Sequence, residues 1–83
     1  MINVQEATKK AIAYMESFYS GLQNIQLEEV ELEDDRNHWQ ITLSFLDQES
    51  MGLPIYPRPK KYKIFRIDST TGDVISMKIR DIR

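Results

Sequence analysis

The sequence predicts an α+β fold in which one N-terminal helix packs on a four-stranded antiparallel β-meander. Apolar residues first recur at three- and four-residue steps, a helical spacing. A clean period-two alternation then begins at Trp39, and two shorter alternating stretches follow around a turn at Gly72. At 83 residues the chain is expected to form one domain, 1–83, whose apolar residues suffice for one helix on one sheet.

The helix is predicted from about Asn3 to Ser20. Asn3 followed by Glu6 is typical of a capping box, in which both side chains bond to free backbone N–H groups. Gly21 is a natural stop because it adopts a left-handed conformation at little cost. One face of this helix is apolar and is formed by Val4, Ala7, Ala11, Met15, Phe18 and Leu22.

A hairpin is expected next, with strands at about 27–33 and 38–46. The first strand changes its alternation phase at Glu28 and Glu29, which indicates a bulge or a late start of the strand. A polar turn follows at 34–37. The second strand alternates cleanly from Trp39 to Phe45, which is typical of a half-buried strand.

The third and fourth strands are predicted at about 61–68 and 73–80. They flank a tight turn in which Gly72 suits a positive φ. The side chains expected to line the core are Trp39, Ile41, Leu43, Phe45, Phe65, Ile67, Ile75, Met77 and Ile79.

The connection 47–60 fits neither period. Its three prolines remove backbone donors and forbid a central strand, and a loop of this length is often functional. Apolar residues in it either form a contact surface for a partner or fold back over the open sheet face, near Leu46, Tyr62 and Ile64. Both alternatives stay open at the level of sequence.

Three stretches of the chain resemble the PepSY family of small α+β domains. They are N-V-Q-E-A-x-x-x-A (Asn3 to Ala11), W-Q-I-T-L (Trp39 to Leu43) and Y-K-I-F-R-I-D-S-T-T-G-D-V-I-S (Tyr62 to Ser76). The resemblance covers most of the chain, apart from the proline-rich insertion at 47–60. It implies a non-catalytic regulatory or inhibitory binding domain and supplies no catalytic residue. A cystatin-like domain with the same order of elements is the alternative.

The composition of the chain bears on its cellular location and on its interactions. There is no cysteine, which favours a reducing compartment, and we expect a cytoplasmic location. Neither a membrane-spanning run nor a signal peptide is visible, so no membrane insertion is expected. Residues 1–57 hold ten acidic and three basic side chains, whereas 58–83 hold eight basic and three acidic. This division marks either an interaction surface or elements that pair with each other inside the fold.

The candidate catalytic and metal-binding groups are few. Asp34 and Asp35 are neighbours in a polar turn, where we expect them to point apart and stay solvated. His38 is the only histidine and is expected to be exposed, without convergent ligands or a positioned partner. We therefore predict no enzyme activity, no catalytic residue, no metal site and no cofactor.

The favoured function is a small binding or regulatory module that contacts an unidentified protein through its open sheet face and the 47–60 loop. The residues predicted to make this contact, termed the loop set, are Met51, Leu53, Ile55, Tyr56, Arg58, Tyr62 and Ile64. The alternative is nucleic-acid binding by the basic C-terminal half. Its residues, termed the basic set, are Lys60, Lys61, Lys63, Arg66, Lys78 and Arg80. A monomer or a weak homodimer paired through the fourth strand is expected.

Overall fold

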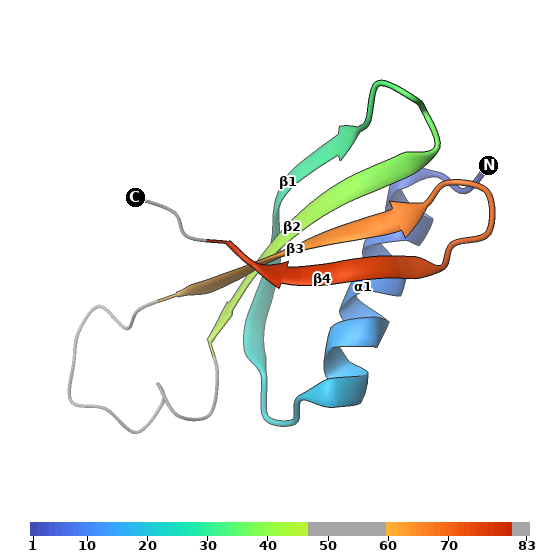
Figure 1. Ribbon diagram of the computed structural model, residues 1–83. Coiled ribbons are helices and arrows are strands. Elements are labelled where there is room, and N and C mark those ends of the chain that lie inside the picture. Colours follow the sequence, from blue (N-terminus) through green and yellow to red (C-terminus); the bar gives the residue numbers. More distant parts are fainter. Residues whose placement is uncertain (47–59, 81–83) are drawn as a thin grey trace.

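The computed structural model describes residues 1–46 and 60–80 and confirms the α+β fold (Figure 1). The elements are α1 (Val4–Phe18), β1 (Gln23–Leu32), β2 (His38–Leu46), β3 (Lys61–Asp68) and β4 (Val74–Ile79). The strands form one antiparallel sheet in the order β1-β2-β3-β4, with α1 against one of its faces. The opposite face is called the open face below.

The predicted capping box begins α1. The Glu6 backbone N–H donates to Asn3 Oδ1 at 2.8 Å, and the Asn3 backbone N–H donates to Glu6 Oε1 at 3.4 Å. The helix ends at Phe18, slightly earlier than expected, because Tyr19 already has an extended backbone at φ −129°. Gly21 has a φ of +73° in the turn that leads to β1, the left-handed conformation that glycine favours.

The core lies between α1 and the two central strands. Buried apolar residues come from the helix and from the alternating positions of β2 and β3, and they are Ala7, Ala11, Met15, Ile41, Leu43, Phe45, Phe65 and Ile67. Trp39 and Met77 pack against this core while half-buried. Small alanines on α1 let the helix backbone approach the sheet closely, so the larger side chains of β2 and β3 fill the space between the layers.

Two predicted core residues are not in the core. Ile75 is 49% exposed and Ile79 is 80% exposed. The register shifts between Arg66 and Ile67, so Val74 takes the position opposite Ile67 and Ile75 is an additional residue. A helix about 10 Å wide covers roughly two strands spaced about 4.8 Å apart. The two outer strands are therefore less covered than the central pair, and the expectation for these two isoleucines was wrong.

The first strand is longer and less regular than expected. It begins at Gln23, and its pairing with β2 shifts twice, the second time between Leu27 and Glu29. This second shift is the bulge that the alternation phase indicated. Leu27 and Val30 lie opposite the core residues of β2, yet they are 46% and 40% exposed.

Hydrogen bonds tie the two strand-connecting turns at one end of the sheet to the N-terminus. Buried Ser69 donates through Oγ to the Arg36 carbonyl at 2.9 Å, and its own carbonyl accepts from the Ile2 N–H at 2.7 Å. The Trp39 indole Nε1 donates to the Ile2 carbonyl at 3.1 Å. These contacts fix the β1–β2 turn, which borders the candidate site.

Candidate protein-binding site at the edge of β1

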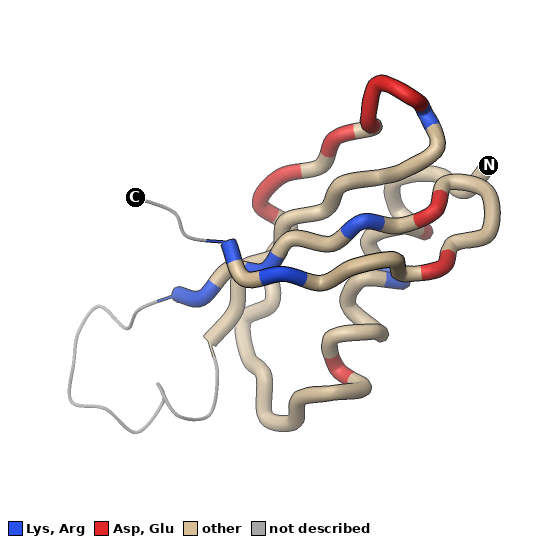
Figure 2. The backbone as a smooth tube through the Cα atoms, viewed as in Figure 1, with Lys and Arg blue, Asp and Glu red and all other residues tan. Residues whose placement is uncertain are grey.

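Charged side chains reach across the open face from the basic strands to β1. Figure 2 shows acidic residues along β1 and the turn after it, and basic residues along β3 and β4. Arg66 donates two hydrogen bonds to the Glu33 carboxylate, at 2.8 and 2.9 Å. Arg80 pairs with Glu29 and also donates to Thr42 Oγ1 at 2.8 Å. Basic residues of the C-terminal half thus pair with acidic residues of the N-terminal half inside the fold.

This pairing separates the members of the basic set. Lys60 lies 4.0 Å from Glu28, and Arg66 and Arg80 hold the β1 carboxylates just described. Lys63 is on the helix side of the sheet, with its Nζ 5.1 Å from the centroid of the Tyr19 ring. Lys61 and Lys78 are exposed. The basic set therefore does not form one continuous cationic surface.

His38 is half-buried beside two carboxylates, not exposed as expected. Its Nδ1 lies 3.3 Å from Asp35 Oδ2, 3.9 Å from Glu33 Oε1 and 3.3 Å from Arg66 Nη2. Asp35 also accepts from the Asn37 backbone N–H at 2.8 Å. Asp35 is exposed, as expected for a turn residue, but its carboxylate is also hydrogen-bonded within the turn.

These contacts shift the ionisation of the acids. Hydrogen bonds from Arg66 lower the pKa of Glu33, and the same contact raises the pKa of Arg66. The Asn37 backbone N–H, with help from His38, lowers the pKa of Asp35. Both carboxyl groups are thereby held in their charged form.

This cluster offers ligand atoms for a metal ion, but the negative charge of Glu33 is already neutralised. Atoms of Glu33, Asp35 and His38 lie within 4.8 Å of one another. The Arg66 guanidinium, however, already neutralises Glu33 bidentately and contacts the histidine nitrogen. A cation at this point would have to displace it, so we assign no metal site to this group.

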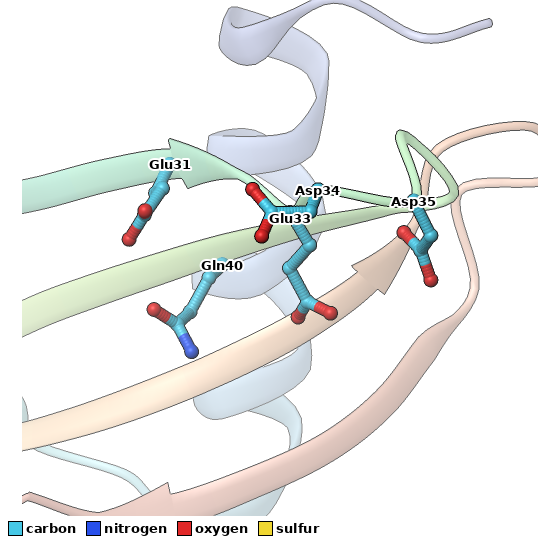
Figure 3. Close-up of a pocket in the computed structure, with 5 residues that line it drawn as sticks. All are labelled: Glu31, Glu33, Asp34, Asp35 and Gln40. Atoms are coloured by element: carbon cyan, nitrogen blue, oxygen red, sulfur yellow. The ribbon is translucent and has the colours of Figure 1, made fainter.

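An open depression of about 460 Å³ lies beside this cluster (Figure 3). It is lined by Glu31, Glu33, Asp34, Asp35 and Gln40. In Figure 3 the Glu31, Glu33 and Gln40 side chains project from the open face, while Asp34 and Asp35 come from the turn after β1. Within residues 1–46 and 60–80, no ion pair involves Glu31 or Asp34. Two carboxylates that have no ion pair among the described residues therefore line the same depression.

The same edge presents backbone groups that have no strand beside them. The Glu33 N–H donates to the His38 carbonyl at 2.9 Å, so this residue pair is hydrogen-bonded across the β1–β2 ladder. Hydrogen-bonded and non-bonded pairs alternate in an antiparallel ladder, and the register is continuous from Glu29 to Leu32. The backbone groups of Val30 and Leu32 therefore point away from β2, where the described part of the chain places no further strand.

The loop set lies only partly within the described residues. Met51, Leu53, Ile55, Tyr56 and Arg58 lie outside the described residues. The two other members, Tyr62 and Ile64, are half-buried on the open face, opposite Ser44 and Thr42 of β2. The two alternatives for the loop, contact with a partner and fold-back over these residues, both stay predictions.

Sequence reasoning undervalued β1. The exposed Leu27 and Val30 and the glutamates of this strand belong to neither the loop set nor the basic set, so no contact residue was predicted here. A usable signal was the spacing of Glu29, Glu31 and Glu33, because a two-residue step puts all three on one face of a strand.

Comparisons with protein-family models, curated proteins and solved structures find no match for this chain. The PepSY-like resemblance therefore stays a prediction. Among the residues that the structure describes, no helix combines the length and the apolar character needed to cross a membrane.

Proposed function

We propose that the protein is a small, non-catalytic binding module that contacts another protein through the outer edge of β1. One observation carries the proposal. This edge combines outward-facing backbone groups with the exposed side chains of Leu27 and Val30, and none of the described residues forms a strand against it. Edges of this kind are used in proteins that recognise an extended partner segment by main-chain hydrogen bonding.

The proposal includes a regulatory role, as the PepSY-like resemblance implies, and a cytoplasmic location, which the absence of cysteine supports. No observation favours the nucleic-acid alternative. Three cations of the basic set are paired with carboxylates of β1, and a fourth, Lys63, is on the other face of the sheet. Glu31 and Asp34, which have no ion pair among the described residues, would repel phosphate groups at the depression beside β1.

The test uses proline to block the edge without damaging the ladder. Because the Val30 N–H points away from β2, Val30→Pro removes no hydrogen bond inside the sheet but hinders the addition of a strand. Ile79→Pro is the matched control at the opposite edge. The Arg80 N–H donates to the Tyr62 carbonyl at 3.0 Å, so by the same alternation the Ile79 N–H points outward from β4.

Tagged wild-type protein and both variants are used to recover partners from the native host, and circular dichroism checks that each variant is folded. We expect a partner that is recovered by the wild type and by Ile79→Pro but is lost with Val30→Pro. Equal recovery of every partner by the folded Val30→Pro variant would refute a contact through β1.

A further inference from the structure

We propose that the partner segment is an extended strand in which basic and apolar residues alternate, and that it adds to β1 as a fifth strand of the sheet. This inference rests on the proposed function and specifies the chemistry of the partner. It follows from three properties of β1, which concern its backbone, its helix-side face and its open face.

The backbone fixes the spacing of the contacts. Val30 and Leu32 carry the outward N–H and C=O groups, and their side chains lie on the helix side because they face Ile41 and Trp39 of β2. In an added antiparallel strand, the residues that bond to these groups have side chains on the same side of the sheet. Every second residue of the partner therefore lies on the helix side, and those between lie on the open face.

The helix side of this edge requires apolar partners. Leu27 and Val30 are 46% and 40% exposed because α1 spans mainly the two central strands. A fifth strand with apolar side chains on this side would cover both residues and extend the core outward. Removing this apolar surface from water favours the association.

The open face of the edge requires basic partners. Glu29 and Glu33 already hold Arg80 and Arg66, but Glu31 lies between them without an ion pair among the described residues. Asp34 lines the same depression and also has no ion pair among the described residues. A Lys or Arg of the added strand that lies opposite Glu31 enters this depression and meets both carboxylates.

The chain itself contains a segment of this pattern. In β4, Met77 lies on the helix side opposite Phe65, and Lys78 lies on the open face opposite Ile64. Ile79 and Arg80 continue the alternation. A peptide of residues 74–80, VISMKIR, is therefore a natural probe, and a second copy of the chain is the competing occupant that the experiment must distinguish.

The experiment measures fluorescence anisotropy of labelled peptides added to the full chain. KVKVKVK has the alternating pattern, and KKKKVVV has the same composition and charge without it. We expect KVKVKVK and VISMKIR to bind, and KKKKVVV to bind at least about tenfold more weakly, a difference of about 1.4 kcal/mol. Val30→Pro should remove the preference for the alternating peptide. Glu31→Gln should weaken binding about fivefold, whereas Glu16→Gln, at an exposed acid on α1, should leave it unchanged.

Four results would overturn the inference. Equal binding of KVKVKVK and KKKKVVV would show attraction by charge alone. Equal binding to the wild type and to Val30→Pro would place the peptide elsewhere. A mass by light scattering that rises with concentration, and that falls to the monomer in both Val30→Pro and Ile79→Pro, would assign the edge to β4 of a second copy. If a host partner is lost with Val30→Pro while no alternating peptide binds, the proposed function stands and only the inference about partner chemistry fails.

Discussion

Two isoleucines of the sheet provide a direct test of where the core ends. Ile67 is fully buried in β3, whereas Ile79 in β4 is 80% exposed, although period-two alternation predicts both to face the helix. Replacing each by alanine removes the same atoms from different surroundings. We therefore expect a large loss of stability for Ile67→Ala and a small one for Ile79→Ala.

The magnitudes follow from burial. Ile67→Ala removes three buried carbon groups at about 0.8 kcal/mol each and leaves a cavity, for a total loss of about 3–4 kcal/mol. Ile79 is 80% exposed, so Ile79→Ala loses only about one fifth of the free energy of burying these carbon groups, about 0.5 kcal/mol. With the lower β propensity of alanine the loss stays under about 1 kcal/mol.

Urea denaturation measures both losses, with the fluorescence of Trp39 as the probe. Trp39 is the only tryptophan and is half-buried against the core, so it reports on unfolding of the whole domain. For an m-value near 1 kcal/mol/M, the midpoint for Ile67→Ala should fall by about 3 M, which for a marginal domain approaches complete unfolding. If Ile79→Ala loses as much stability as Ile67→Ala, then the conclusion that α1 leaves the outer strand β4 largely uncovered is wrong.

Three further outcomes can be measured with the same unfolding assay. Gly72→Ala should lose about 1 kcal/mol of stability, because alanine is strained at a φ of +79°. Lys10 Cε lies 3.3 Å from the added Cβ but can move away, so adding Lys10→Ala should not restore the lost stability. Asp68 accepts backbone N–H bonds in the β3–β4 turn that lower its pKa below 3.8, so its contribution to stability is present above about pH 4 and is lost as the pH falls through the lowered pKa. Asp68→Asn should therefore make the loss of stability at acid pH less steep, and an unchanged pH dependence would contradict this. Glu31→Pro should lose about 2 kcal/mol more than Val30→Pro, since only the first removes a ladder N–H, and equal losses would contradict the assigned alternation.

Local sequence was sufficient for the elements themselves. The capping box at Asn3 and Glu6 and the apolar spacing that follows it predict the helix, because helix initiation depends on groups only a few residues apart. The alternation from Trp39 to Phe45 likewise predicts β2, since a strand displays its two faces through period two alone. The phase break at Glu28 and Glu29 indicated the bulge for the same local reason.

The candidate site was only partly visible at this level. The sequence showed an excess of acidic side chains in residues 1–57 and of basic side chains in 58–83. Which charges neutralise each other depends on the register of strands that are far apart in sequence, as in the pair of Glu33 with Arg66. No local pattern contains that information, so Glu31, which has no ion pair among the described residues, could not be distinguished from Glu29 and Glu33.

The amino-acid sequence by itself therefore determined the order of helix and strands and, where the register is continuous, the face to which a strand residue belongs, because both depend on short-range geometry. The tertiary structure alone decided how far each face is covered. A single helix is too narrow for four strands, so Val30 and Ile79 are exposed although their alternation resembles that of buried Ile41. It also decided that Arg66 and Arg80 pair with Glu33 and Glu29, whereas Glu31 between them has no ion pair among the described residues.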